Sequence, residues 1–146
     1  MSFLKLQNLS THFPVRGGGL ISRQTEIIKA VDGVSLEIGQ GEILGLVGES
    51  GCGKSTLSRT VMQLQPATSG TVTLNGEELT SLPKKEIRSR RLDFQMIFQD
   101  PYASLNPRMT VFSTLAEALC QRHPELKKDK TLTSKVVELM TTVGLD

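Results

Sequence analysis

Apolar and polar residues alternate over two short stretches in the first forty residues of the chain. The first covers residues 3–9, and the second places Val34, Leu36 and Ile38 at every other position. A period of two is typical of strands with one buried face, so we expect two strands that pair with each other. Residues 12–25 between them contain three consecutive glycines and predict a flexible loop or the tip of a long hairpin.

A short, almost uninterrupted apolar run at residues 42–47 follows a Gly-Gln-Gly turn. Such a run predicts a strand that is buried on both faces. The pattern then becomes helical over residues 56–65, and the proline and turn residues at positions 66–70 end it. We therefore expect a strand, a glycine-rich loop and a helix in immediate succession.

Further strands and helices follow in alternation. Residues 71–74 predict a strand that runs into an Asn-Gly hairpin turn. Pro83 suits the first turn of a helix that continues to about Arg91, and residues 92–98 predict another strand. From position 111 onward apolar residues recur at helical spacing, which predicts two helical faces. Their members are Val111, Phe112, Leu115 and Leu119, then Val136, Val137, Met140 and Val143.

Composition keeps the chain among ordinary globular proteins. It has 146 residues, of which 38% are hydrophobic and 22% charged, so a single domain is expected. The formal net charge of +2 is too small to predict nucleic-acid binding. A local basic cluster is expected to be a solvated helix face without a function of its own. Its members are Lys84, Lys85, Arg88, Arg90 and Arg91.

Membrane and redox features add two expectations. Apolar runs are far shorter than the roughly 20 residues that cross a bilayer, and the N-terminus does not resemble a secretory signal. We therefore expect a cytoplasmic protein. Cys52 and Cys120 lack the spacing of a zinc site or a disulfide framework, so we expect free thiols.

The loop before the predicted helix matches the phosphate-binding pattern G-x-x-x-x-G-K-[ST], known as the P-loop or Walker A motif. Glycines allow the backbone to wrap around phosphate oxygens, and the helix N-terminus adds unpaired amides and a favourable dipole. The candidate nucleotide-binding residues are Gly48, Glu49, Ser50, Gly51, Cys52, Gly53, Lys54, Ser55 and Thr56.

Three side chains of this loop have distinct expected roles. Lys54 should reach the β- and γ-phosphates of ATP, and the Ser55 hydroxyl should ligate the Mg²⁺ that bridges them. Thr56 can donate a hydrogen bond on the α-phosphate side. The expected cofactors are therefore ATP and Mg²⁺.

Four other segments narrow the class of P-loop protein. Residues 29–36 and 41–43 before the P-loop resemble the opening of an ABC ATPase domain, and residues 69–76 continue the likeness. Residues 95–111, read as QMIFQDPYASLNPRMTV, resemble the Q-loop region of the oligopeptide and dipeptide importer ATPases. The likeness extends from about Leu4 to Asp146.

This resemblance implies an α/β fold: a P-loop core with an antiparallel β subdomain over residues 1–110, and the start of a helical subdomain over residues 111–146. It implies an ATP-binding subunit of an importer for peptides or related solutes. Such a subunit lies on the cytoplasmic face of the membrane and works with transmembrane permease subunits and a second ABC ATPase subunit.

The resemblance also assigns individual roles. Gln99 corresponds to the Q-loop glutamine, which ligates Mg²⁺, orients the attacking water and senses the permease. Together with Lys54 it is the expected catalytic residue. The aromatic residue that usually stacks on adenine is absent from residues 24–28, which leaves Phe13 as the nearest candidate, with apolar packing as its alternative role.

Other interpretations of the P-loop remain open. Asp100 after an apolar run could instead organise Mg²⁺ in a different P-loop NTPase, and a non-catalytic nucleotide-binding fragment is a further alternative. The LSGGQ signature, the Walker B strand with its catalytic glutamate and the switch histidine do not occur in the 146 residues. We therefore expect this chain to bind ATP weakly and to turn it over negligibly.

Overall fold

The computed structural model describes residues 2–16 and 25–145 of the chain. These residues form two compact units, Met1–Gln95 and Met96–Asp146, and each is described by itself. Residues 12–25 were predicted as a flexible loop or the tip of a long hairpin. Residues 12–16 and 25 instead lie in strands, so a loop is wrong for them, and residues 17–24 lie outside the described residues.

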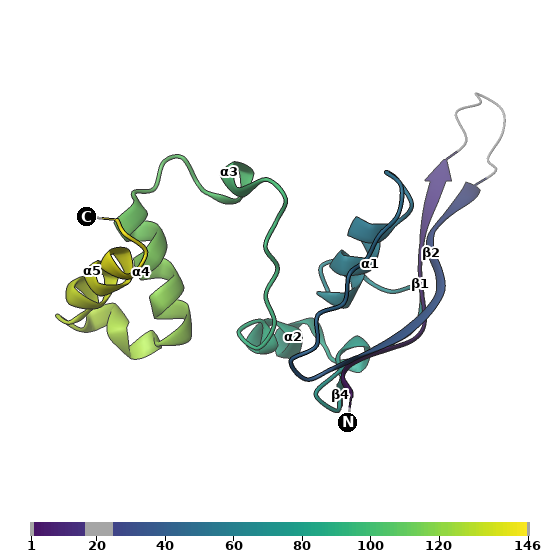
Figure 1. Ribbon diagram of the computed structural model, residues 1–146, viewed down its shortest axis with the longest axis horizontal. Coiled ribbons are helices and arrows are strands. Elements are labelled where there is room, and N and C mark those ends of the chain that lie inside the picture. Colours follow the sequence, from purple (N-terminus) through teal and green to yellow (C-terminus); the bar gives the residue numbers. More distant parts are fainter. Residues whose placement is uncertain (1, 17–24, 146) are drawn as a thin grey trace. The chain divides into compact units, whose positions relative to one another are not determined.

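An antiparallel sheet with the order β2-β1-β3-β4 forms the first unit. Its two long strands run side by side as a hairpin (Figure 1). This confirms the expected pair, although both strands are longer than the alternation predicted, because pairing continues from Phe13–Ile28 to Arg16–Thr25. The strands are β1 Ser2–Arg16, β2 Thr25–Gly39, β3 Ser69–Leu74 and β4 Glu77–Glu78.

The predicted hairpin after β3 is also present. Asn75 and Gly76 both have positive φ, of 48° and 83°, as a two-residue type I′ turn requires. The turn returns the chain into β4, where Thr73 pairs with Glu78. A short 3₁₀ helix, η1 Leu79–Ser81, follows it.

Helix α1, Lys54–Val61, packs against this sheet and ends four residues before the predicted end at Gln65. The reason is local. Gln63 has a φ of 52°, and the amides of Leu64 and Gln65 donate to the carbonyl of Arg59, which closes the helix. Helix α2, Lys84–Arg90, begins after Pro83 as predicted.

The core of the first unit lies between the sheet, α1 and the segment from η1 to α2. Its buried apolar side chains come from every one of these elements, which explains why they fold together. They are Leu6, Leu9, Val31, Leu57, Val72, Leu79 and Ile87.

Two predicted strands are wrong in this structure. Residues 42–47 and 92–98 have no strand conformation, and the side chains of Ile43 and Ile97 are 96% and 97% exposed. A strand needs a neighbour to accept and donate its backbone hydrogen bonds. Within residues 2–16 and 25–145 no strand pairs with either segment, so apolar sequence alone does not make them strands.

The second unit is helical, as the spacing from position 111 predicts. Helices α4, Val111–Arg122, and α5, Leu132–Thr142, lie side by side and are joined through the 3₁₀ helix η2, Pro124–Lys128 (Figure 1). A single turn, α3 Pro101–Ser104, precedes them. Among the described residues, none of the helices has both the length and the apolar character needed to span a bilayer.

Candidate functional site

The loop at residues 48–53 has a backbone conformation that strongly favours glycine at two positions. Gly51 and Gly53 have φ values of 83° and 95°. A Cβ atom on Gly53 would lie 2.1 Å from the carbonyl oxygen of Ala30 in β2, and one on Gly48 would lie 2.7 Å from the Sγ of Cys52. The glycines therefore let the loop turn tightly while it touches the sheet.

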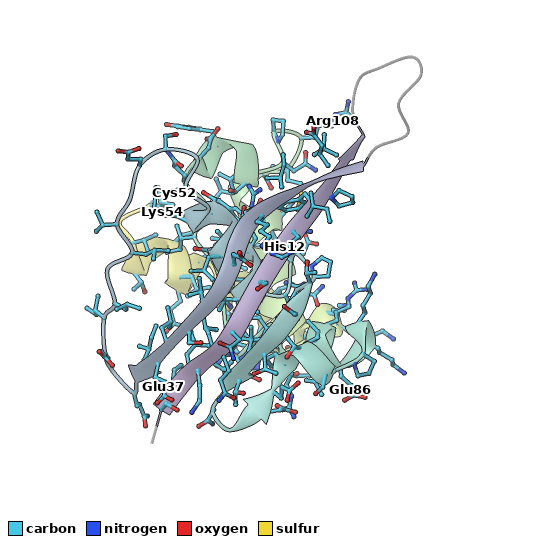
Figure 2. All side chains as sticks on the ribbon, turned by 90° about the vertical axis from the view of Figure 1, so that its right-hand side faces the viewer. His12, Glu37, Cys52, Lys54, Glu86 and Arg108 are labelled. Atoms are coloured by element: carbon cyan, nitrogen blue, oxygen red, sulfur yellow. The ribbon has the colours of Figure 1, made fainter. Side chains whose placement is uncertain are left out.

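The ammonium group of Lys54 closes this loop from inside. Its Nζ donates to the carbonyl oxygens of Gly48 and Glu49, each at 2.6 Å, and lies 3.5 Å from the Sγ of Cys52. Figure 2 shows Cys52 and Lys54 next to each other where the loop enters α1. Ser50 is exposed on the turn of the loop. The lysine thus lies beside the backbone that would surround a phosphate group.

Helix α1 directs unpaired amides toward the same loop. The first backbone hydrogen bond of the helix is donated by the amide of Leu57 to the carbonyl of Gly53. Gly53, at the N-cap, has no side chain that could accept from the amides that precede Leu57. In the described part of the chain, the amides of Ser55 and Thr56 donate to no other group. These donors and the positive end of the helix dipole favour an anion at this position. The hydroxyls of Ser55 and Thr56 lie on the same turn of α1.

A charged cluster flanks the point where the loop touches β2. The Asp32 carboxylate accepts a hydrogen bond from the Lys29 ammonium at 3.1 Å, and its other oxygen lies 3.1 Å from the Nε2 of His12. The hydrogen bond from Lys29 is the largest cause, and that from His12 the next, that lowers the pKa of Asp32 below its ordinary value of 3.8. The cluster links β1 to β2 through side chains.

Phe13 is half-buried on β1 and pairs with Ile28 of β2. Ile28 is two positions from Ala30, whose carbonyl meets the loop at Gly53. The hairpin therefore places the backbone of Phe13 in the same region of the sheet as the loop. Both roles predicted for Phe13, adenine stacking and apolar packing, therefore stay predictions.

Gln99 belongs to the second unit, so its position relative to the P-loop stays a prediction. It is exposed and lies two residues before Pro101, where α3 begins. The neighbouring Asp100 has a local structural role, because its carboxylate accepts a hydrogen bond from the amide of Tyr102 at 3.0 Å. This bond caps the short helix α3.

One supporting contact was not predicted from the sequence. The hydroxyls of Thr11 in β1 and Thr60 in α1 lie 2.9 Å apart and are buried, and Thr60 also donates to the carbonyl of Thr56 at 2.9 Å. These bonds hold α1, the helix that follows the loop, against the inner strand β1. The partners are 49 residues apart. No local pattern in the sequence reports such a contact.

Comparisons with known proteins agree with this geometry. A profile described as ABC transporter matches residues 31–146. The oligopeptide transport ATP-binding protein OppF of Escherichia coli is 46% identical over 143 residues, which cover 97% of this chain and 42% of the relative. AppF of Bacillus subtilis, described by the same words, is 42% identical over 145 residues, covering 99% and 43%. The chain thus spans less than half the length of these relatives.

Other relatives and solved structures widen the comparison. The glutathione import ATP-binding protein GsiA of Pectobacterium atrosepticum is 44% identical over 138 residues, which are 91% of this chain and 22% of the relative. The dimeric structure of a bacterial ABC transporter cassette is 28% identical, with a TM-score of 0.64 over 80% of this chain and 46% of its own. Together with the P-loop geometry, these matches establish that the chain belongs to the ABC transporter family, as part of its ATP-binding domain.

Proposed function

We propose that this chain is the nucleotide-binding part of an ATP-binding subunit of an importer for oligopeptides or related solutes. The observation that carries the proposal is the loop at residues 48–53 together with the first turn of α1, where glycines, the Lys54 ammonium and unpaired helix amides lie close to one another. The names of the relatives support the transport role, because they describe ATP-binding proteins for oligopeptide transport and glutathione import.

The loop suits a triphosphate for steric and electrostatic reasons. A Cβ atom on Gly53 would overlap the carbonyl of Ala30 in β2, and one on Gly48 would overlap the side-chain sulfur of Cys52. On ATP binding, Lys54 exchanges the carbonyls of Gly48 and Glu49 for phosphate oxygens. The amides of α1 then donate to the phosphates, so that the loop and the helix N-terminus bind the anion by hydrogen bonds and by charge.

Mg²⁺ fits the same turn of α1. Magnesium takes oxygen ligands and usually keeps several waters, with one or two protein groups and phosphates completing its octahedron. The exposed Ser55 hydroxyl makes no hydrogen bond to another described residue, so it is free to ligate the ion. When bound, Mg²⁺ neutralises charge that develops on the phosphates.

The remaining roles in this proposal rest on the family resemblance. By its correspondence to the Q-loop glutamine, Gln99 would ligate Mg²⁺ and orient the attacking water. Residues 1–110 serve as the β subdomain and P-loop core, and residues 111–146 begin the helical subdomain. The subunit lies on the cytoplasmic face of the membrane, where it docks on permease subunits and pairs with a second ATPase subunit.

Titration calorimetry with MgATP tests the central claim. We expect weak but measurable affinity for the native chain and its loss in Lys54→Ala, because the ammonium is the loop's only side-chain cation. Lys130→Ala is the matched control, since it removes an exposed lysine of the second unit and should leave affinity unchanged. A folded native chain without affinity, or equal affinity in both variants, would contradict the proposal.

A second comparison separates the proposal from another kind of P-loop enzyme. Gln99→Ala should weaken the Mg²⁺-dependent part of nucleotide affinity, whereas Asp100→Asn should affect mainly the short helix that its carboxylate caps. The opposite ranking would make Asp100 the metal-organising residue. Phosphate release should be negligible in all variants, because the 146 residues contain no signature motif and no catalytic glutamate.

A further inference from the structure

A concave surface lies in the first unit, on residues that the P-loop does not use. It is a groove of about 820 Å³ between the end of α1, the start of β3 and helix α2. A volume of this size is typical of small-molecule sites. Its polar lining includes Gln63, Thr68, Ser69, Lys84, Arg88 and Arg91.

Helix α2 supplies the charge of this groove. Lys84, Arg88 and Arg91 are spaced by four and three residues, so they share one face of the helix and its C-cap. Ile87 on the same helix is only 6% exposed and anchors α2 to the core. Among the described residues that line the groove there is no aspartate or glutamate, so three cations face it without a compensating carboxylate from this part of the chain.

The basic side chains of α2 differ in their partners. Arg90 forms an ion pair with Glu77 at 2.9 Å and does not line the groove. Arg91 donates to the carbonyl of Gln63 at 3.3 Å, which ties α2 to the end of α1. Within the described part of the chain, Lys84 and Arg88 form no hydrogen bond or ion pair. Two cations of the groove are therefore available to a ligand.

The opposite wall of the groove is fixed by the sheet. Gly70 has a φ of 81°, and a Cβ atom there would lie 2.3 Å from the carbonyl oxygen of Asn8. The amide of Thr68 donates to Ser10 at 2.7 Å, and its hydroxyl accepts from the amide of His12 at 2.9 Å. These contacts hold residues 68–70, at the start of β3, against β1, so the groove has a preorganised wall.

We propose that this groove binds a small phosphorylated ligand that carries at least two phosphoryl groups. Arg88 can present a planar fork of donors to one phosphoryl group, and Lys84 a point charge to another. The exposed Ser69 hydroxyl adds a donor from the facing wall. The sequence alone predicted a solvated helix face here, and the concave setting is what distinguishes a ligand site from such a face. This site is separate from the proposed ATP site.

Pyrophosphate binding to the Lys54→Ala chain tests the site, because this background removes the P-loop cation. We expect the additional pair Lys84→Gln and Arg88→Gln to weaken affinity about tenfold or more, through loss of two charge-assisted hydrogen bonds. The matched control pair is Lys127→Gln with Lys128→Gln, which removes the same charge from exposed positions of the second unit and should change affinity less than about twofold. Equal losses in both pairs would show a nonspecific charge effect and overturn the proposal.

Amide NMR spectra of the native chain provide a readout that does not depend on folding of the variants. Pyrophosphate should shift the amide signals of residues 68–70 in addition to those of the P-loop. Shifts confined to residues 48–56 would overturn the proposal.

Vesicles of phosphatidylserine distinguish a lipid headgroup from a free ligand. We expect the chain with the groove pair of substitutions and the chain with the control pair to cosediment with these vesicles to the same extent. If the groove pair alone loses vesicle binding while its pyrophosphate affinity is retained, the basic surface contacts a membrane and the small-ligand proposal is wrong.

Discussion

Gly53 combines two constraints that usually occur separately. Its φ of 95° is unfavourable for any residue with a Cβ atom, and its missing side chain leaves room for the carbonyl of Ala30. Gly51 in the same loop has a similar φ of 83°, but a Cβ atom there would meet nothing within 4 Å. A substitution at Gly51 would therefore add backbone strain alone, whereas one at Gly53 would add both backbone strain and steric overlap.

Replacing each glycine by alanine should reveal this difference. Gly51→Ala should lower the free energy of unfolding by about 1–2 kcal/mol, the usual cost of a left-handed conformation. Gly53→Ala should cost clearly more, because the overlap with Ala30 forces the loop away from β2. Urea unfolding followed by circular dichroism measures both. Equal losses would mean that the loop moves without resistance from the sheet.

Asp32 gives the first unit a defined pH dependence. Its folded-state pKa is lowered, first by the hydrogen bond from Lys29 and then by that from His12. A carboxyl group with a depressed pKa stabilises the fold fully above its unfolded value, near 3.8, and loses this contribution as the pH falls through the folded value. Native and Asp32→Asn chains should therefore differ in stability at neutral pH and converge below about pH 3.8.

The Lys29→Ala variant checks the cause of this shift. Removal of the ammonium should raise the pKa of Asp32 toward its ordinary value, as measured by carboxyl NMR signals during acid titration. An unchanged titration would assign the shift to His12 instead.

The contact between α1 and β1 depends on a directional pair of hydroxyls. Thr60 donates to the carbonyl of Thr56, so its oxygen accepts the proton of Thr11, and both side chains are at most 1% exposed. Removing the acceptor and removing the donor therefore have different consequences. Loss of Thr60 leaves a buried hydroxyl on Thr11 without its partner, whereas loss of Thr11 leaves Thr60 bonded to its own helix.

Valine substitutions should show this asymmetry. Thr60→Val should lower the free energy of unfolding by about 1–3 kcal/mol, and Thr11→Val by about 0.5–1.5 kcal/mol. The double variant should lose less than the sum, since no buried donor is left unpaired. Denaturant titrations of the three chains measure the coupling. Additive losses would show that the two hydroxyls do not interact.

Local sequence patterns predicted the elements that depend on residues close together in the sequence. The β1–β2 pair, the Asn75-Gly76 turn and helices α4 and α5 depend on alternation, turn chemistry and helical spacing within short segments. The P-loop was also recognisable, because its chemistry is contained in nine consecutive residues. In contrast, the end of α1 depended on the positive φ of Gln63, which its residue type does not specify.

Contacts between distant segments account for the rest. The Thr11–Thr60 bond, the contact of Gly53 with Ala30 and the groove beside α2 each join residues from separate elements. The two wrong strands failed for the same reason, because a strand is a property of a pair of segments. Apolar composition predicted that residues 42–47 would be covered, but it could not provide the neighbour that covers them.

The whole chain consequently exposes apolar segments that ordinary globular surfaces avoid. Ile43 and Val47 are 96% and 93% exposed, and both lie within residues 42–47, which have no partner strand among the described residues. Exposed apolar segments with free backbone amides and carbonyls pair readily with further copies. We therefore predict that this chain self-associates in solution through residues 42–47.

Sedimentation velocity over a range of concentrations tests this prediction. At about 100 μM, where exposed strands commonly associate, the native chain should populate species larger than a monomer. Ile43→Lys with Val47→Lys should shift the distribution toward monomer, because charged side chains disfavour edge pairing. Val137→Lys with Val143→Lys is the matched control, since these apolar residues are also exposed but lie on and just after α5. If both pairs reduce association equally, general surface hydrophobicity drives it, and an unpaired strand segment is not its cause.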